Sequence, residues 1–335
     1  MKVLFDHPSP FLLAHGGFQI QIEQTNLALQ RLGIDVEWLR WWDTSQTGEV
    51  IHYFGRASHS YLDFAHAKGL KVVMAELLTG LGSRGAVARF AQRAVIQTLQ
   101  RSSFFDRMNW RAYQRCDAAV ALTEWEAKLM RSVFNAPAER VHVIPNGVEE
   151  VFTPGDPKGT RGPWLVCSAT ITERKRVLEL VQSAVAAATP LFVIGAPYAA
   201  DDPYFRRFRE FVATHGDVVR FEGAVSNRAR LAEIYREARG FVLLSTMESL
   251  SLSALEAAAC GCPLLLSDLP WARSVFADQA AYCPASAGRQ ATATCLRAFY
   301  DAAPSRPVPE RPESWDQVAA RLAKLYTHVT PELTR

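Results

Sequence analysis

The chain has 335 residues, of which 49% are hydrophobic, so it can bury a large core and is long enough for two domains. Its formal net charge of +3 is too small to indicate a nucleic-acid-binding protein as a whole. A single lysine precedes a short apolar run at the N-terminus, and no stretch approaches the roughly 18 apolar residues of a membrane span. We therefore expect a soluble, cytoplasmic protein with neither a signal peptide nor a membrane-spanning helix.

The cysteines agree with a reducing compartment. All six lie outside Cys-x-x-Cys pairs and share no metal-ligand spacing with histidine. Several fall in apolar runs, where a reduced, buried thiol is the ordinary state of cysteine. The sequence therefore predicts free thiols and no zinc site.

The first predicted elements are a strand, a glycine turn and a helix. Residues 2–5 have the pattern of a strand, and an apolar periodicity over residues 20–32 predicts a helix. His15, Gly16 and Gly17 lie between them, and a glycine turn that leads from a strand into a helix can bind an anion. A plain tight turn and a solvated histidine are the simpler alternative. Gly16 and Gly17 are therefore candidate ligand-binding residues, and His15 is a weaker one.

Aromatic and acidic residues follow the next predicted strands. Trp41 and Trp42 come just after the strand at residues 36–39, where they could stack on a sugar ring or pack the domain edge. Glu76 lies near the end of the strand at residues 71–77. Another strand, residues 50–54, contains His52.

Residues 80–85 match the pattern Gly-x-Gly-x-x-Gly, follow a strand and precede a helical run. A dinucleotide site would also need a second strand that ends in an acid about 20 residues later. The corresponding stretch, residues 101–110, is polar and aromatic without a strand pattern. We therefore expect a flexible glycine loop over an acceptor cleft instead of a dinucleotide site.

A basic stretch follows this loop. Residues 84–115 contain seven arginines, beginning with Arg84, and one acid, Asp106, for a local charge of +6. The helix predicted at residues 86–99 has an apolar face that includes Val87 and Phe90 and a separate basic face. A solvated helix face is one interpretation. The other is attraction to anionic lipid headgroups at the inner membrane surface, or to a phosphate-bearing or nucleic-acid acceptor.

The remaining elements alternate between strand and helix. Strand patterns and helix patterns follow each other through both halves, which predicts two doubly wound α/β domains. Residues 151–163, rich in proline, glycine and charge, and residues 304–312, with four prolines, have the composition of linkers. The predicted strands are residues 117–122, 140–144, 164–169, 191–195, 218–221, 241–244, 264–266 and 280–284, and the predicted helices are residues 177–188, 204–215, 231–238, 253–259, 271–276 and 315–326.

Residues 245–270 combine the features of a ligand site. Glu248 follows a strand, at the end where open α/β sheets bind ligands. The backbone amides of Ser251, Leu252 and Ser253 lie at a helix start and could bind a phosphate. Glu256, about one turn into that helix, could accept hydrogen bonds from a ribose diol. A sugar and a nucleoside diphosphate would fit one pocket with an acid at either end.

Glu248 and Glu256, with seven residues between them, and the following Ala-Ala-Ala-Cys-Gly-Cys-Pro turn resemble the Glu-x7-Glu motif of family 4 retaining glycosyltransferases. The resemblance implies the GT-B fold, with two Rossmann-like domains that face across a cleft. It also implies a nucleotide-diphosphate sugar as donor, a UDP- or GDP-sugar, and a hydroxyl-bearing acceptor. The Ile-Pro-Asn-Gly-Val segment ending at Val148 and the tryptophan-to-tyrosine helix near the C-terminus resemble family elements that close the first domain and cross back onto it. We expect an acceptor-binding domain at residues 1–152, a donor-binding domain at 153–312 and a returning helix at 313–335.

The resemblance also implies roles for single residues. Lys175 would clamp the diphosphate, and the loop around Val225 would cover the base mainly through backbone groups. Glu248 would position the sugar and Glu256 would bind the ribose. Glu248 and Lys175 are the candidate catalytic residues. Gly16 and Gly17 would lie near the donor phosphates and sugar. The weak candidates for contact with the acceptor are His15, Trp41, Trp42, Glu76 and Arg84.

Two positions depart from the family pattern. Thr170 replaces an arginine that helps to hold the diphosphate, so Arg174 or Arg176 would have to supply that charge. Glu76 stands where many members carry a histidine beside the transferred sugar. There is no Asp-x-Asp motif, so we expect no metal. A nucleic-acid acceptor, a catalytically degenerate subunit and a nucleotide-sugar epimerase are the alternatives.

Overall fold

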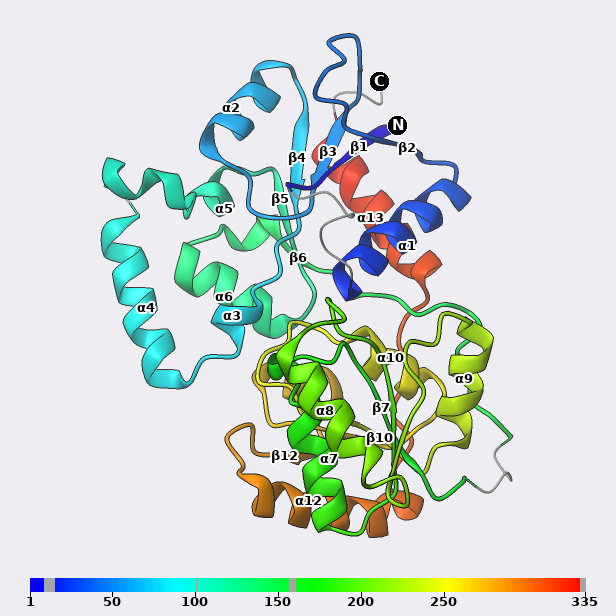
Figure 1. Cartoon of the computed structure of the whole chain (residues 1–335). Coiled ribbons are helices and arrows are strands. Elements are labelled where there is room, and N and C mark those ends of the chain that lie inside the picture. The colour runs from blue at the N-terminus through cyan, green and yellow to red at the C-terminus, as the bar shows by residue number, and fades with distance from the viewer. Residues whose placement is uncertain (9–15, 101, 157–160, 332–335) are drawn as a thin grey trace. The chain divides into compact units, whose positions relative to one another are not determined.

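The computed structural model describes residues 1–8, 16–100, 102–156 and 161–331. The chain divides into two compact units (Figure 1). Unit 1 comprises residues 1–147 together with 315–335, and unit 2 comprises residues 148–314. From sequence we placed these boundaries after residues 152 and 312.

Unit 1 is built on a parallel six-stranded sheet of order β2-β1-β3-β4-β5-β6. Its central strands are buried on both faces and consist almost wholly of apolar residues, as the strands of a sheet covered by helices on both sides must be. The strands are β1 Lys2–Asp6, β2 Asp35–Trp38, β3 Val50–Tyr53, β4 Lys71–Met74, β5 Ala118–Ala121 and β6 Val141–Val143.

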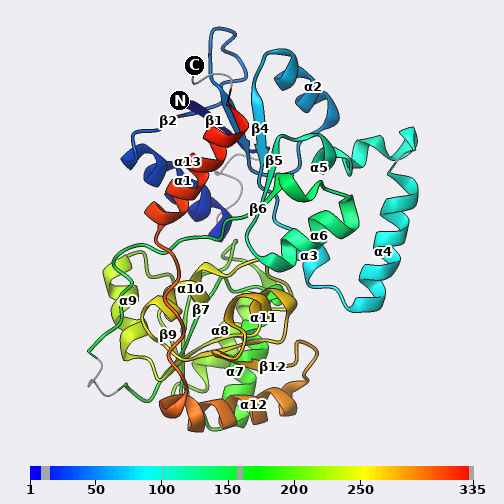
Figure 2. The same cartoon turned by 180° about the vertical axis from the view of Figure 1, so that it is seen from behind.

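Helices cover this sheet, and the last helix of the chain is among them. In both views α13 lies beside α1 (Figures 1 and 2). The ring of Tyr326 on α13 is fully buried, and its hydroxyl forms a 2.6 Å hydrogen bond with Nδ1 of His52 on β3. The helices of unit 1 are α1 Gly17–Arg31, α2 His59–Ala67, α3 Thr79–Gly82, α4 Ala86–Leu99, α5 Ala112–Arg115, α6 Glu124–Phe134 and α13 Trp315–Val329.

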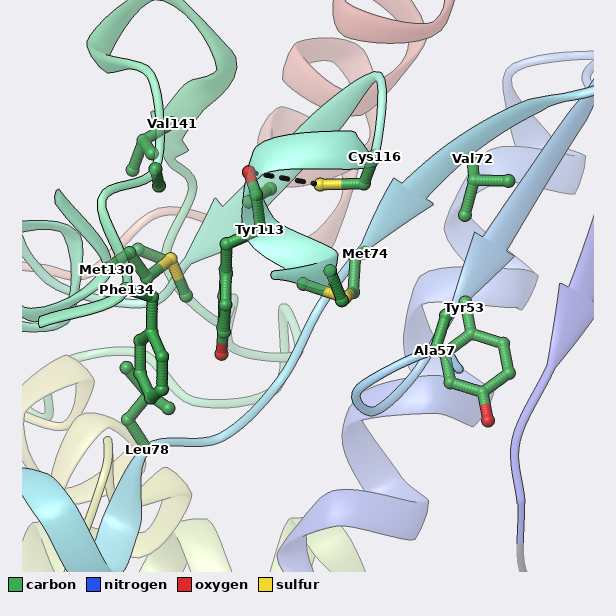
Figure 3. Packing of buried hydrophobic residues seen from close by; sticks show 14 of the residues in the cluster. Tyr53, Ala57, Val72, Met74, Leu78, Tyr113, Cys116, Met130, Phe134 and Val141 are labelled. Carbon is green, nitrogen blue, oxygen red and sulfur yellow. Dashed lines mark hydrogen bonds between the residues drawn. The ribbon is translucent and has the colours of Figure 1, made fainter. Parts of the chain in front are cut away.

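The core on one side of this sheet is mainly aliphatic and contains one stacked pair of aromatic rings. Tyr113 and Phe134 stack with their ring centroids 4.6 Å apart, and the thiol of Cys116 approaches the carbonyl oxygen of Tyr113 at 3.8 Å (Figure 3). All six cysteines of the chain are free in this structure; Cys295 is half-buried and the others are buried.

Unit 2 is a second parallel six-stranded sheet, of order β12-β11-β10-β7-β8-β9. Its strands are β7 Leu165–Ser168, β8 Leu191–Ile194, β9 Val219–Phe221, β10 Gly240–Leu243, β11 Leu264–Ser267 and β12 Ala280–Cys283. Its helices are α7 Val177–Ala186, α8 Pro203–Ala213, α9 Arg228–Glu237, α10 Leu252–Ala259, α11 Pro270–Phe276 and α12 Arg289–Ala302. The two sheets confirm the predicted α/β class with two doubly wound, Rossmann-like domains.

Some predicted details were wrong. Gly80 and Gly82 belong to the short helix α3 instead of a flexible glycine loop, and Gly82 is buried. The indole nitrogen of Trp125 donates to the carbonyl oxygen of Gly82 at 3.1 Å, which fixes this segment against α6. The helices α2, α5 and α12 were not predicted. Within the described residues, no helix is long and apolar enough to cross a membrane.

Candidate functional site

The strand order of unit 2 creates a natural ligand site. β7 is the first strand of the sheet, the chain then builds β8 and β9 on one side of it, and β10, β11 and β12 extend the other side. The loops that leave the carboxyl ends of β7 and β10 therefore diverge, and open α/β sheets bind ligands in the crevice at such a switch point. Both predicted catalytic residues, Lys175 and Glu248, lie on these two loops.

Lys175 and Glu248 form an ion pair in unit 2. Lys175 ends a short 3₁₀ turn after β7, and its ammonium group donates to Oε1 of Glu248 at 2.5 Å. The two side chains are 12% and 9% exposed, so little water screens the pair. Arg174 lies beside them, with Nη1 3.5 Å from the same carboxylate oxygen and 2.9 Å from the carbonyl oxygen of Met247. Two cations and one carboxylate thus meet at the switch point.

Arg176 has a different role from its neighbours. Its backbone is left-handed, with φ of 53°, which turns the chain from the 3₁₀ turn into α7. Its guanidinium donates to the carbonyl oxygens of Ala285 and Ala287, both at 2.8 Å. Our suggestion that Arg176 could replace the family arginine missing at Thr170 therefore finds no support in this geometry, and Arg174 is the better placed cation.

The helix α10 begins where the sequence predicted a phosphate site. Ser251 caps the helix by accepting a hydrogen bond from the amide of Ala254 at 3.3 Å, and its hydroxyl also contacts that of Ser253 at 3.1 Å. Leu252 is the first helical residue. The first amides of a helix lack partners inside the helix and carry its positive dipole end, so they favour an anion.

Glu256 lies on α10 and is almost completely buried. Its Oε1 accepts a hydrogen bond from Nη2 of Arg228, the first residue of α9, and the hydroxyl of Tyr235 is 3.5 Å from Oε2. Desolvation raises the pKa of Glu256, and the charge and hydrogen bond of Arg228 partly offset that rise. The carboxylate expected to bind a ribose is thus held in place by α9.

Arg228 also binds a second acid. Its Nε donates to Oε1 of Glu149 at 2.7 Å, and its guanidinium lies 4.7 Å from the ring centroid of Phe152. Desolvation lowers the pKa of Arg228, but the carboxylates of Glu256 and Glu149 outweigh it and raise the pKa overall. Sequence reasoning missed Arg228 and Glu149, because they lie 28 and 107 residues before Glu256 and no local pattern links them to it.

The edge of the sheet around this site also holds buried hydroxyl groups. Among the described residues, the hydroxyls of Ser245, after β10, and Ser267, at the end of β11, lack a hydrogen-bond partner in the protein. The loop after β9 carries Val225, which is half-buried between Gly223 and α9. The backbone of Gly195 packs directly against the loop after β7. A Cβ atom on this residue would lie 1.9 Å from the carbonyl oxygen of Ala169 in that loop.

The predicted residues of unit 1 are more dispersed. Gly16 caps α1 with φ of 150°, a conformation that favours glycine, and Gly17 is the first residue of that helix. They form the start of α1, which follows β1, and β1 and β3 are neighbours at the switch point of this sheet. His15 lies outside the described residues. Trp41 and Trp42 are 85% and 66% exposed and contact each other edge to face.

Glu76 accepts three hydrogen bonds from two side chains. Arg56 binds its two carboxylate oxygens at 2.7 and 2.9 Å, and the hydroxyl of Tyr113 donates to one of them at 2.5 Å. The guanidinium of Arg56 in turn lies 4.7 Å from the ring centroid of Phe134. This network gives Glu76 a clear structural role, and contact with an acceptor stays a prediction.

The basic helix α4 presents its apolar side chains outward. Val87, Phe90 and Val95 are 85%, 73% and 50% exposed, whereas Ile96 is the one buried residue of the helix. The helix packs on α6, partly through Arg89, whose guanidinium lies 4.7 Å from the ring centroid of Trp125. The sequence predicted the helix and its two faces, but it did not show which face would point away from the protein.

Two family models match the chain. Residues 49–152 match the model described as Glycosyltransferase Family 4, and residues 154–296 match the one described as Glycosyl transferases group 1. The curated relatives include a D-inositol 3-phosphate glycosyltransferase of Acidothermus cellulolyticus, 31% identical over 44% of this chain and 38% of that protein. One of the same name from Mycobacteroides abscessus is 29% identical over 49% of this chain and 39% of that protein. The chain thus matches about two fifths of the length of these relatives.

Solved structures resemble the whole chain. A sucrose-phosphate synthase from Thermosynechococcus elongatus superposes with a TM-score of 0.72 at 18% identity and covers 98% of each chain. HepE of Anabaena, in complex with UDP and glucose, has a TM-score of 0.62 at 12% identity over 97% of this chain and 99% of its own. At such identities the likeness concerns the fold.

Proposed function

Because this chain belongs to the family 4 glycosyltransferases and has their GT-B fold, we propose that it transfers a sugar from a nucleotide-diphosphate sugar to a hydroxyl acceptor with retention of configuration. The observation that carries the proposal is the convergence at one edge of unit 2. Lys175, Glu248, the start of α10 and Glu256 all lie at or beside the switch point of its sheet.

Each of these groups matches one part of the donor. Lys175 and Arg174 supply positive charge for the diphosphate, and the first amides of α10 add the positive end of a helix dipole. Glu248 faces the sugar hydroxyls, and Glu256 accepts hydrogen bonds from the ribose. A bound diphosphate would compete with Glu248 for the ammonium of Lys175.

The reaction exchanges one C–O bond for another. The bond between the anomeric carbon and the diphosphate breaks, the acceptor oxygen bonds to that carbon, and the acceptor proton leaves with the nucleoside diphosphate. The difficulty is charge separation between an oxocarbenium-like sugar and an anionic leaving group. Fixed cations and helix amides lower the barrier because they already point at the place where the negative charge develops. We propose that the reaction needs no metal.

The proposed donor is a UDP- or GDP-sugar. Solved neighbours that were crystallised with UDP or UDP-glucose support uridine as the first base to test. The proposed acceptor is a lipid-linked, saccharide or small-molecule hydroxyl. The curated relatives are named for D-inositol 3-phosphate, which supports an acceptor that carries a phosphate as one case.

We also propose that the protein is cytoplasmic and meets anionic surfaces through residues 84–115. The apolar side chains that α4 exposes, together with its arginines and the absence of any acid on that helix, suit a membrane with anionic headgroups. The same basic stretch would suit a nucleic-acid acceptor, which salt-sensitive DNA binding would reveal.

The donor site can be tested by thermal shift with UDP, GDP, ADP and TDP, each also as a sugar conjugate. One base should stabilise the wild type by about 2.7 kcal/mol at a hundredfold excess over Kd. Glu256→Ala should lose most of this stabilisation. If no nucleotide stabilises the wild type, the enzyme proposal fails and a degenerate subunit is the better description. Turnover of the donor sugar to its epimer without an acceptor would instead identify an epimerase.

A further inference from the structure

A half-buried arginine, Arg228, connects the carboxylate of Glu256 to the segment where the chain enters unit 2. We propose that Arg228 is a positioning residue that keeps Glu256 ionised and correctly oriented for the nucleotide. Glu149 weakens this effect because it binds the same guanidinium. The inference rests on the proposed function, because it assigns Glu256 to nucleotide binding.

The geometry of Arg228 supports a fixed orientation. Its Nε binds Glu149 and its Nη2 binds Glu256, so the two acids occupy different corners of one planar guanidinium. The ring of Phe152 lies against the guanidinium. Arg228 can then rotate only by breaking both ion pairs.

Glu256 needs this arginine to remain charged. Its side chain is 7% exposed, and burial favours the protonated acid. The other titratable groups near it are Tyr235, whose hydroxyl is 3.5 Å away, the thiol of Cys260 and the more distant carboxylate of Glu149. Burial raises the pKa of both Tyr235 and Cys260, so Arg228 is the positive charge that directly pairs with Glu256. A protonated Glu256 would offer fewer acceptor sites to a ribose diol.

Glu149 acts on Glu256 in the opposite sense. Its negative charge raises the pKa of Glu256, and it takes part of the hydrogen-bonding capacity of Arg228. Glu149 follows Val148, the first residue of unit 2, whose amide donates to the carbonyl oxygen of Glu313 at 2.9 Å. The state of the nucleotide-binding carboxylate is therefore linked to the segment where the chain enters unit 2.

The test measures UDP and GDP binding by calorimetry from pH 5.5 to 8.5 for the full chain and four variants. Arg228→Gln should weaken binding about tenfold near pH 6.5, because Glu256 protonates at a higher pH, and the loss should shrink as the pH rises. Glu149→Gln should have the opposite effect: the acid limb of the binding profile, where affinity falls as Glu256 protonates, should shift to lower pH. Because the phosphates of the nucleotide also titrate in this range, each variant is compared with the wild type at the same pH.

Two further variants provide controls. Arg228→Lys retains the charge and should restore the pH profile in part, although it cannot reproduce both hydrogen bonds. Arg230→Gln, two residues along the same helix, removes an exposed arginine paired with Glu233 and should bind as the wild type does. Circular dichroism melting of each variant measures folding independently of binding.

The outcomes separate the two proposals. If the wild type binds neither nucleotide, the donor assignment fails, and the role of Arg228 fails with it. If the wild type binds but the variants keep the wild-type pH profile, or lose affinity equally at every pH, the positioning role alone is overturned. Opposite shifts of the acid limb for Arg228→Gln and Glu149→Gln support it.

Discussion

Arg174 and Arg176 show how adjacent residues of the same type take different tasks. Arg174 is partly exposed and directs its guanidinium toward Glu248 and the carbonyl oxygen of Met247. Arg176 turns back to bind two carbonyl oxygens in the loop between β12 and α12. Their sequence context is the same run of charge, so the difference arises from the left-handed backbone of Arg176.

We expect the two alanine variants to separate binding from stability. Arg174→Ala should weaken UDP binding about tenfold and leave the free energy of unfolding within about 0.5 kcal/mol of wild type. Arg176→Ala should lower that free energy by about 1–3 kcal/mol, because two carbonyl groups lose their donor. Calorimetry and urea unfolding measure the two effects. A large loss of UDP affinity in folded Arg176→Ala, with none in Arg174→Ala, would reverse the assignment.

At the same scale, the sequence predicted the residues that a local motif connects. Lys175, Glu248 and Glu256 each follow a recognisable strand or helix start, so their place at the sheet edge could be predicted. Arg228 and Glu149 could not, because their importance comes from a contact between segments that are far apart in the chain. Glu76 was noticed as a departure, but its partners Arg56 and Tyr113 were invisible for the same reason.

Among the elements, α4 departs most from the usual arrangement of an amphipathic helix. Val87, Phe90 and Val95 are exposed, whereas Ile96 is buried and the half-buried Arg89 contacts Trp125 of α6. The helix itself lies beside α6 (Figure 1). A helix normally buries its apolar stripe in the core of its own domain. An outward stripe beside arginines is the arrangement expected of a helix that lies on an anionic membrane.

We expect Phe90→Ser to reduce binding of the protein to vesicles that contain phosphatidylglycerol, while the free energy of unfolding changes by less than about 0.5 kcal/mol. Phe64, on α2, is 72% exposed, so Phe64→Ser is a matched control that should leave vesicle binding unchanged. Co-sedimentation with anionic and with neutral vesicles measures the effect. Equal loss in both variants, or no binding of the wild type, would contradict the proposed surface.

Element prediction failed where tertiary contacts decide the conformation. Glycine is a poor helix former, so residues 80–85 looked like a loop. In the structure, residues 80–82 belong to α3, which Trp125 of α6 binds through the carbonyl oxygen of Gly82, and a Cβ atom at Gly82 would be 3.4 Å from the indole nitrogen. The strands were predicted more successfully than these short helices, because a buried parallel strand is a continuous apolar run that the sequence displays directly.

For the whole molecule, acid stability should depend on the return of α13 to unit 1. His52 is buried against Tyr326 of that helix, and burial lowers the pKa of His52 from 6.5 to about 3. The folded protein thus binds fewer protons at this site than the unfolded chain does. The stabilisation is present above pH 6.5 and is lost as the pH falls toward 3.

We therefore expect the stability of unit 1 to fall by up to about 1.4 kcal/mol per pH unit as the pH drops below 6.5. His52→Phe should flatten this dependence, whatever its effect at neutral pH. Hydrogen exchange measured by mass spectrometry on peptides of β3 and α13 follows unit 1 separately from unit 2. His215→Gln, on unit 2, is the control and should leave the slope unchanged. An unaltered slope in His52→Phe would show that other groups govern acid unfolding.

Unit 1 consists of two stretches of the chain separated by unit 2, and this order has a consequence for biosynthesis. The ribosome delivers the six strands of unit 1 first, then all of unit 2, and α13 last. Until α13 emerges, α1 and the buried ring of His52 lack the helix that covers them. The half of the protein that is made second can therefore be the first to fold completely. A nascent chain that stops before Trp315 would contain all of unit 2 but a unit 1 that lacks α13.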